Sequence, residues 1–452
     1  MRNTRRLIAT CSAATVAALV AILPSAAGAA SAAGAASAIP AAVVVRPGQV
    51  RQVIDGFGFA EAFRQPVITA LPQAEQQQLG DLLFSPRSGA GMSIVRFGLG
   101  GATDPGDPIS GPGDAAEQLW LGHLAQEFGV RQFYADAWSA PASMKTNDSL
   151  DNGGDLCGAP GAAPCANGDQ RLAYADYLAG QAAGFAAAGI PLKAVGFINE
   201  PEIGPAYASM QLTPAQAANF VPYLGRALAA AHLRTRVACC DNEGWGTAAQ
   251  YVQAVLGDPA SARYIGLITS HGYTAPPAAQ LTGERPVWES EWANFSAWDP
   301  AWDDGTAGDG LTWASDIQAA LTSGDVDAFF YWWGASASTA NSGLIQVLGP
   351  TINLSKGYWA FAAFGRYIRP GAVRISASSP DSDLAVSAFR NRDGSAVVEI
   401  LNTGTASAPV RLRGLPARGA TAYVTSEADS LAPVTGPLAV PARSLLTVVI
   451  AR

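Results

Sequence analysis

The chain has 452 residues, and only 14% of them are charged. Its 28 lysines and arginines face 36 acidic residues, and the formal charge of −8 argues against nucleic acid or an anionic membrane surface as a partner. The length allows one large core and a smaller second one.

Residues 1–38 have the layout of a secretory signal peptide. Arg2, Arg5 and Arg6 precede an apolar stretch from Leu7 to Pro24, and small residues follow. A membrane anchor is the alternative, but polar residues interrupt a run that is already marginal for a bilayer span. The paired arginines leave the twin-arginine export route open. We expect a secreted, extracellular protein that is free of the membrane after cleavage.

Residues 53–370 alternate short apolar strands with segments at helical spacing, after an N-terminal strand within residues 39–52. The predicted strands are Gly56–Ala60, Ser93–Leu99, Arg131–Ala137, Ala194–Glu200, Arg236–Asp241, Ile265–Gly272, Val287–Glu291 and Ala328–Trp333. The predicted helices are Gln73–Leu83, Asp114–Glu127, Arg171–Ala188, Pro214–Ala231, Thr247–Val255 and Thr312–Thr322. This series of strand–helix units predicts an α/β fold, a (β/α)8 TIM barrel.

A doubly wound open sheet is the main alternative to the barrel. Such sheets usually have fewer units and a phosphate-binding loop. Here the glycine-rich stretch Gly98-Leu99-Gly100-Gly101 is not followed by lysine or by a clear helix, so we expect no nucleotide site.

Residues 371–452 change to short alternating strands separated by turn residues, which predicts an antiparallel β-sandwich. Its strands are predicted at Val373–Ala377, Leu384–Arg390, Ala396–Asn402, Ala408–Arg413, Ala420–Thr425 and Ser444–Ile450. The N-terminal strand, Ala42–Val45, is expected to join it, so that both termini form this domain.

Two glutamates close predicted barrel strands. The apolar run ending at Ile198 stops at Asn199-Glu200-Pro201, because proline cannot donate to a strand ladder, and a second strand ends at Glu291. Hydrolysis of a glycosidic bond requires two carboxyl groups, one as acid and one as nucleophile or base. The alternative is that both glutamates are solvated in loops.

Other strand ends give candidate substrate contacts, because barrel active sites lie at the carboxyl ends of the strands. These candidates are Glu61, Arg96, Trp138, Asn199, Glu243, His271, Tyr273 and Trp332. A structural ion pair for Arg96, a satisfied barrel rim for His271 and Tyr273, and a core position for Trp332 are the alternatives. Glu202 and Glu289 compete with the favoured glutamates, since strand alternation puts residues two apart on one face.

Four cysteines remain after the signal segment, an even number that suggests disulfides in an exported protein. Cys157 and Cys165 bracket a short loop and are expected to pair. Cys239 and Cys240 could bond to each other, or each could reach the other loop. A zinc site is not expected, because the chain has no Cys-x-x-Cys pair and only three histidines. No metal or organic cofactor is needed for carboxyl chemistry.

Several motifs together resemble glycoside hydrolase family 30. They are Asp55-Gly56-Phe57-Gly58, Trp138-Ser139-Ala140-Pro141, Asn199-Glu200-Pro201, Ser270-His271-Gly272-Tyr273 and Arg369-Pro370-Gly371, in the family's order. The resemblance implies a retaining enzyme with a barrel and a two-terminus β-sandwich, Glu200 as acid/base and Glu291 as nucleophile. Two departures stand beside Glu291: Ser290 replaces the usual threonine, and Glu289 adds an acid.

A narrower resemblance concerns substrate. Four segments look like the endo-β-1,6-galactanases of that family, in loops expected to rim the cleft. They are Met144-Lys145-Thr146-Asn147, Asn152-Gly153-Gly154-Asp155-Leu156-Cys157-Gly158, Tyr207-Ala208-Ser209-Met210 and Cys239-Cys240-Asp241-Asn242-Glu243-Gly244-Trp245. We therefore expect a monomeric hydrolase of arabinogalactan side chains with carboxyl groups ~5–5.5 Å apart. Asn199 would hold the 2-hydroxyl, and Arg96 and Tyr273 would keep Glu291 charged. Another family activity, β-1,6-glucanase or xylanase, and a non-catalytic carbohydrate-binding protein are the alternatives. Endo and exo cleavage remain open.

Overall fold

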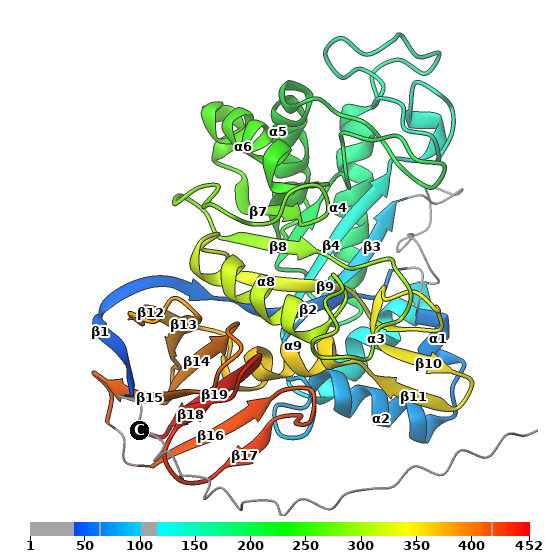
Figure 1. Ribbon diagram of the computed structural model, residues 1–452. Coiled ribbons are helices and arrows are strands. Elements are labelled where there is room, and N and C mark those ends of the chain that lie inside the picture. The colour runs from blue at the N-terminus through cyan, green and yellow to red at the C-terminus, as the bar shows by residue number, and fades with distance from the viewer. Residues whose placement is uncertain (1–39, 63–64, 101–114, 417–418) are drawn as a thin grey trace, which may run out of the picture. The chain divides into compact units, whose positions relative to one another are not determined.

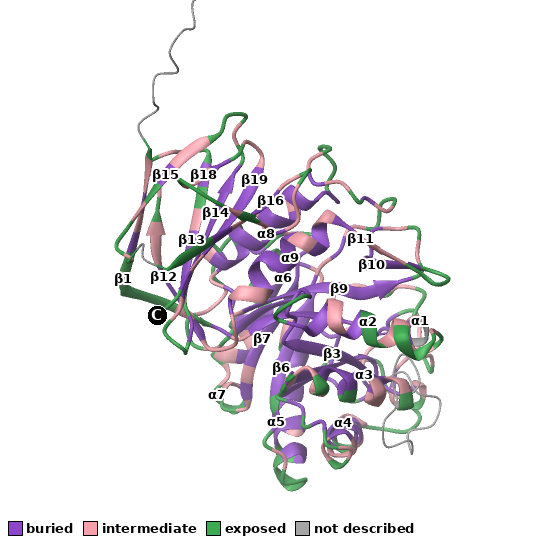
Figure 2. Ribbon diagram, turned by 90° about the horizontal axis from the view of Figure 1, so that it is seen from below, coloured by how far each residue is buried: buried purple, intermediate pink, exposed green. Residues whose placement is uncertain are grey.

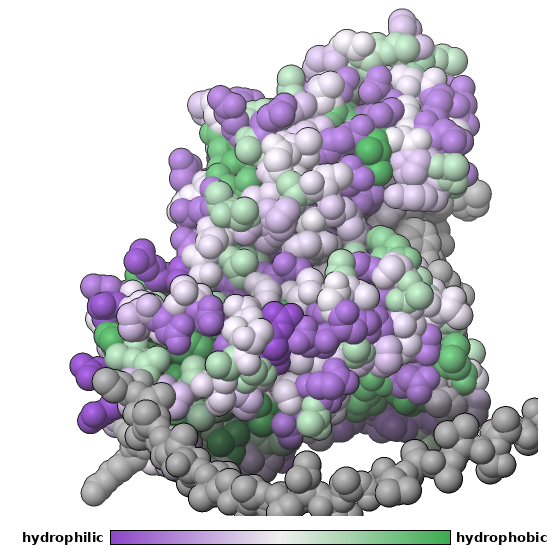
Figure 3. Space-filling view, in the orientation of Figure 1, coloured by the Kyte–Doolittle hydropathy of each residue, from purple (hydrophilic) through white to green (hydrophobic). Residues whose placement is uncertain are grey.

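The computed structural model describes residues 40–62, 65–100, 115–416 and 419–452. The predicted signal peptide, residues 1–38, lies outside these ranges. Within the described part of the chain, no helix is both long and apolar enough to cross a bilayer. Hydrophilic and weakly hydrophobic side chains intermingle on the face shown in Figure 3, which suits a chain with few charged residues.

Eight parallel strands form a closed barrel (Figure 1). They are β2 (Gly56–Ala60), β3 (Ile94–Gly100), β4 (Gln132–Ser139), β5 (Ala194–Gly196), β6 (Arg236–Asn242), β7 (Ile265–His271), β8 (Val287–Glu291) and β9 (Ala328–Ser336). Strand β9 pairs with both β2 and β8, which closes the ring. The predicted TIM barrel is therefore confirmed.

Helices follow the barrel strands. They are α1 (Gln65–Thr69), α2 (Gln73–Phe84), α3 (Ala115–Glu127), α4 (Arg171–Ala187), α5 (Pro214–Ala230), α6 (Trp245–Gly257), α7 (Pro259–Ala262), α8 (Gly310–Thr322) and α9 (Lys356–Tyr367). Helix α5 begins with a capping box, in which Thr213 accepts from the Gln216 backbone and the Gln216 side chain returns the bond. A hairpin, β10 (Gly343–Leu348) and β11 (Thr351–Leu354), extends the sheet beside β9.

The remaining strands form a nine-stranded sheet in the β-sandwich domain. They are β1 (Ala41–Ile54), β12 (Ala372–Ser378), β13 (Leu384–Arg390), β14 (Ala396–Asn402), β15 (Ala408–Arg413), β16 (Ala420–Thr425), β17 (Ala432–Val434), β18 (Ala439–Val440) and β19 (Ser444–Ile450). Strand β1 pairs antiparallel with β12 and parallel with β15. Both termini therefore build this domain, as the sequence predicted.

Strand β5 differs most from its prediction. It ends at Gly196, whereas the sequence placed the strand end at Glu200. The backbone of Glu200 has a φ of 46°, and its N–H donates to the carbonyl of Asp241 at 2.8 Å instead of to a neighbouring strand ladder. Glu200 is therefore presented by a turn that is fastened to β6, and not by the strand itself.

The barrel interior below the carboxyl ends is apolar. Its buried side chains form a cluster of Ile94, Tyr134, Ala194, Ala238, Leu267, Trp288, Ala328 and Phe330. Figure 2 shows the barrel strands as almost continuously buried. This layer fills the barrel as side chains do in such folds, so any cleft has to open above it.

Candidate active site

A cleft of about 550 Å³ opens at the carboxyl ends of the barrel strands, a volume typical of sites for small molecules or short oligomers. It is lined by Trp138, Asn199, Glu200, Ile203, Tyr207, Glu243, Tyr273, Glu291, Phe295, Trp332 and Trp333. Most of the predicted site residues are in this set. Aromatic rings cover several sides of the cleft, and the carboxyl groups lie among them.

Glu291 ends β8 and points into the barrel. The Arg96 guanidinium donates to its Oε2, and the Tyr273 hydroxyl donates to its Oε1 at 2.9 Å. Burial raises the pKa of the Glu291 carboxyl, and the positive charges of His271 and Arg96 oppose that shift. Because arginine can only donate hydrogen bonds, Glu291 accepts from Arg96 as a carboxylate would.

Glu200 lies across the cleft from Glu291 in the turn after β5. Its Oε2 accepts from the Tyr207 hydroxyl at 3.0 Å, and its Oε1 lies 3.2 Å from Nδ1 of His271. Burial alone would raise the pKa of Glu200, but the hydrogen bonds from His271 and Tyr207 and the charge of His271 lower it. The carboxyl is held from two sides, by one residue of the barrel and one of a rim loop.

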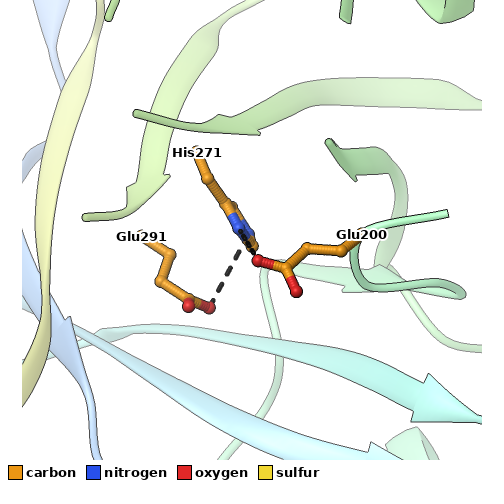
Figure 4. Close-up of side chains that lie close together, drawn as sticks. All are labelled: Glu200, His271 and Glu291. Carbon is orange, nitrogen blue, oxygen red and sulfur yellow. Dashed lines mark hydrogen bonds and ion pairs between the residues drawn. The ribbon is translucent and has the colours of Figure 1, made fainter. Parts of the chain in front are cut away.

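His271 lies between the two glutamates, as Figure 4 shows. Its Nε2 lies 3.7 Å from Oε2 of Glu291, while Nδ1 faces Glu200. One ligand atom from each of the three residues lies within 4.8 Å of the others. The predicted close spacing of the two carboxyl groups is therefore present in the structure.

The same three residues are close enough to hold a metal ion, but their charge state favours proton sharing. Burial opposes protonation of His271, yet the surrounding carboxylates of Glu291, Asp241 and Glu200 raise its pKa well above the ordinary value. A doubly protonated imidazole donates from both nitrogens and has no lone pair for a metal. The carboxylates around the ring therefore favour its protonated form over a metal-binding one.

Arg96 lies beneath the cleft and does not line it. It is fully buried and donates to Asn199 Oδ1 at 2.7 Å and to Asp136 Oδ2 at 3.2 Å, in addition to Glu291. Its guanidinium carbon lies 4.8 Å from the centroid of the Trp138 ring. Arg96 thus orients an amide, a carboxylate and an aromatic ring that all reach the cleft.

The structure places Glu61 differently from its prediction as a substrate contact. The side chain is fully buried, and its Oε2 accepts from the backbone N–H groups of Gly334 at 3.0 Å and Ala335 at 3.2 Å. It is not among the residues that line the cleft. Glu61 fastens the end of β9, where a carboxylate satisfies two backbone donors.

Glu202 and Glu289, the alternatives to Glu200 and Glu291, do not line the cleft. Glu202 lies beyond the end of β5, and it accepts from Asn242 Nδ2 at 2.8 Å and from the Thr247 hydroxyl. Glu289 is fully buried, and its Oε2 accepts from the Phe330 backbone at 3.2 Å. The expectation that Glu289 and Glu291 share a face was wrong, because the pairing register shifts between them and turns Glu291 into the barrel.

Sequence reasoning named none of four further residues as site candidates, although Tyr207 and Asp241 lie in segments that resemble the galactanases. Tyr207 and Phe295 are aromatic side chains on the rim, 47% and 58% exposed, and no periodic pattern marks a loop residue of this kind. Asp136 and Asp241 are fully buried beneath the cleft. Both aspartates lie within predicted apolar strands, and a charged residue in such a run is a usable sign of a functional position.

The rim loops after β4 and β5 are bound to each other. Lys145 Nζ donates to the Leu150 carbonyl at 2.9 Å and to the Ser209 carbonyl at 2.5 Å. Cys157 and Cys165 form the expected disulfide, with sulfurs 1.99 Å apart. The structure also pairs Cys239 with Cys240, one of the two arrangements that the sequence left open. The loops therefore form one connected rim beside Glu200.

Comparisons with known proteins agree with this architecture. The model of the glycosyl hydrolase family 30 TIM-barrel domain matches residues 117–287, and that of the family 30 β-sandwich domain matches residues 371–448. The catalytic domain of GH30 xylanase C from Talaromyces cellulolyticus is 38% identical, with a TM-score of 0.85, and the match covers 91% of this chain and 100% of that one.

Two curated relatives are more distant. Endo-1,6-beta-D-glucanase neg1 from Aspergillus fumigatus is 25% identical over 401 residues, 78% of this chain and 79% of the relative. Glucuronoxylanase XynC from Bacillus subtilis is 24% identical over 318 residues, 67% of this chain and 68% of the relative. The matches with these proteins span two thirds or more of each chain, and the chain belongs to glycoside hydrolase family 30.

Proposed function

We propose that this family 30 glycosidase hydrolyses β-1,6-linked galactan, the side chains of arabinogalactan, as a retaining, endo-acting enzyme. The observation that carries the chemistry is the pair of cleft carboxyl groups, with one oxygen of Glu200 and one of Glu291 within 4.8 Å. Retention requires carboxyl groups only about 5–5.5 Å apart, whereas inversion needs room for a water molecule between them.

Glu291 has the surroundings of a nucleophile. Arg96 and Tyr273 both donate to it, which keeps the carboxylate charged and aimed into the cleft. In the first step Glu291 attacks the anomeric carbon while the bond to the leaving oxygen breaks, and Glu200 gives that oxygen a proton. In the second step Glu200 takes a proton from water, which attacks the anomeric carbon and releases Glu291.

The proton for the first step belongs to Glu200 and His271 together. In the free enzyme the pKa of Glu200 is lowered and that of His271 is raised, so we infer that His271 carries the proton, 3.2 Å from the carboxyl that must deliver it. Two groups that interact this strongly titrate as a pair. Glu291 loses its negative charge as it bonds to the anomeric carbon, and the leaving oxygen becomes more negative. Glu200 then passes a proton to that oxygen and receives the proton of His271.

The substrate proposal rests on the rim loops. Tyr207 and Glu243 line the cleft and come from the segments that resemble endo-β-1,6-galactanases. Arg96 donates to Asn199, which lines the cleft, and this supports the role of Asn199 as a contact for the 2-hydroxyl of the sugar beside the cleavage point. Xylan is the second candidate, because a relative that is 38% identical is named a xylanase.

Secretion and a monomeric state complete the proposal. The Cys157–Cys165 disulfide supports an oxidising compartment, which agrees with the signal-like layout of residues 1–38. A polymeric plant substrate also has to be met outside the cell that makes the enzyme.

Product analysis tests this function. Wild type, Glu291→Ala and the matched control Glu289→Gln are incubated with de-arabinosylated β-1,6-galactan, β-1,6-glucan and glucuronoxylan, and the oligomers are separated and their anomers followed by NMR. We expect galactose oligomers of several lengths from the first polymer only, with the β-anomer formed first, and no product from Glu291→Ala.

Other results would change the proposed substrate, mode of cleavage or nucleophile, or contradict the function as a whole. Products from glucan or xylan would replace the substrate and keep the mechanism, and monomer alone would indicate exo cleavage. Activity that survives in Glu291→Ala but is lost in Glu289→Gln would move the nucleophile. An absence of turnover on all three polymers would contradict the proposed function.

A further inference from the structure

Asp241 is a fully buried acid that lies under both catalytic glutamates. Its Oδ2 accepts from the Tyr134 hydroxyl and from Thr269 Oγ1 at 2.7 Å, and its Oδ1 accepts from Ser290 Oγ at 2.7 Å. Three hydroxyl groups from three strands thus donate to one carboxylate. Such a complete set of donors stabilises the charged form of an acid that has no contact with solvent.

The same carboxylate faces the two cations of the site. Its Oδ1 lies 3.5 Å from Nη2 of Arg96 and 3.4 Å from Nε2 of His271. Arg96 is the cation that holds Glu291, and His271 is the one that faces Glu200. Asp241 therefore competes with both glutamates for positive charge.

The backbone of Asp241 makes a separate connection. Its carbonyl accepts the N–H of Glu200 at 2.8 Å, and its φ is 47°. A positive φ is uncommon for aspartate and is retained where the surroundings determine it. Asp241 thus fixes the turn that carries Glu200 through its backbone. Through its side chain it also contacts Arg96 and His271, the cations that face Glu291 and Glu200.

We propose that Asp241 is a positioning residue that fixes how protons are distributed over Glu200, His271 and Glu291. This inference rests on the proposed function and deepens it. A permanent negative charge beside His271 keeps the imidazole protonated, and it takes up part of the positive charge that Glu200 and Glu291 would otherwise receive. A negative charge at this place also raises the pKa of both glutamates relative to a site without it, so Glu200 can take up a proton from His271 as the bond to the leaving group breaks.

The charged and titratable groups that face Asp241 come from five parts of the barrel. They are Arg96 on β3, Tyr134 and Asp136 on β4, Glu200 after β5, His271 on β7 and Glu291 on β8. Burial opposes ionisation of Asp241, but Arg96, His271 and Tyr134 bring its pKa to about 2. The charge of Asp241 is thus constant over the working pH range.

Asp136 offers a matched control. It is equally buried and accepts from the same Arg96 nitrogen at 3.2 Å. Burial and the nearby charge of Asp241 raise the pKa of Asp136 well above its ordinary value, which favours its neutral form. Replacement of a neutral Asp136 by asparagine leaves the charge of the site unchanged, whereas the same replacement of Asp241 removes one negative charge.

The experiment compares wild type, Asp241→Asn and Asp136→Asn. The pH profile of kcat/KM is measured on the polymer that wild type hydrolyses, and the titration of His271 is followed by NMR with ¹⁵N-labelled histidine. The chain has three histidines, and His123 and His232 are exposed, so the buried His271 is distinguishable.

For Asp241→Asn we expect both limbs of the pH profile and the His271 titration to move to lower pH by about 1–3 units, because one negative charge is removed within 4 Å. Asp136→Asn should keep both limbs in place. A folded Asp241→Asn with an unmoved profile and an unmoved His271 titration would overturn the inference, as would an equal shift in Asp136→Asn.

The wild-type protein supplies a test that needs no variant to fold. His271 that is already neutral at pH 7 in wild type would overturn the inference, and His271 that is doubly protonated there supports it. This titration does not require turnover, so it still decides the role of Asp241 if none of the polymers is hydrolysed.

Discussion

The barrel interior has two layers that share the same strands and differ completely in chemistry. Along β3 the apolar Ile94 is followed on the same face by Arg96, and along β4 Tyr134 is followed by Asp136. The lower layer excludes water with packed apolar side chains. The upper layer, directly above it, holds buried charges that are stable only because each has a partner of opposite charge or a set of hydrogen-bond donors.

The upper layer also breaks the regular alternation of the strands. The pairing of β6 with β7 shifts at Asp241, and that of β7 with β8 shifts at Ser290. Each shift brings an additional side chain into the barrel. The lower layer thus follows from strand periodicity, whereas the upper layer depends on where that periodicity is interrupted.

The largest effect is expected from Glu200→Gln in the upper layer. The variant keeps the size of the side chain and loses the transferable proton, which should lower kcat on polymer about 10²–10⁴-fold. On an aryl glycoside, whose phenol leaves without a proton, the first step should persist, and stopped-flow absorbance should show a burst of phenol followed by slow turnover.

Glu202→Gln is the matched control for that variant. Its carboxyl accepts from Asn242 and Thr247 and lies outside the cleft lining, so most of the activity should remain. If Glu202→Gln shows the burst and Glu200→Gln behaves as wild type, the two roles are exchanged.

Trp288→Ala should affect the lower layer alone. Trp288 is fully buried, packs edge-on against Tyr134 and donates from Nε1 to Asp55 Oδ2 at 2.9 Å. Its loss should cost about 3–5 kcal/mol of unfolding free energy and lower Tm by roughly 4–6 °C. Calorimetry measures the loss. A shifted pH profile in the folded variant would show that the two layers are not separable.

A small effect is expected from Asp327→Asn at the amino end of the barrel. Burial raises the pKa of Asp327 to about 7, and its Oδ2 accepts from the Val287 backbone at 2.7 Å. The folded state binds this proton more tightly, so the contribution to stability is full below about pH 3.9 and is lost as the pH rises toward 7.

Asparagine can accept the same hydrogen bond without titrating. Tm measured between pH 4 and 7 should therefore decline less steeply in Asp327→Asn than in wild type. Parallel curves for the two proteins would mean that this acid is already ionised throughout that range.

The sequence predicts the barrel well because buried parallel strands are nearly continuous apolar runs between helical segments. Glu291 was recognisable as a strand end, and Glu200 from the proline that follows it. Asp241 stands out as a charged residue in an apolar strand, but the direction of its side chain depends on a register shift that pairing with β7 creates. Tyr207 lies in a loop, where no spacing indicates the direction of a side chain. Glu61 ends a strand like the others, and only the position of the β9 backbone shows what its carboxylate binds.

Strand β1 lies between β12 and β15 and ends at Ile54, whereas β12 begins only at Ala372. At the usual speed of translation the strand waits roughly tens of seconds for these neighbours. Until then Val43 and Val45, which are buried in the finished domain, have no permanent cover. Strand β1 can therefore be covered on both edges only after β15 has been synthesised. A chain truncated before β12 keeps an open sheet edge, which is a site for unwanted strand pairing.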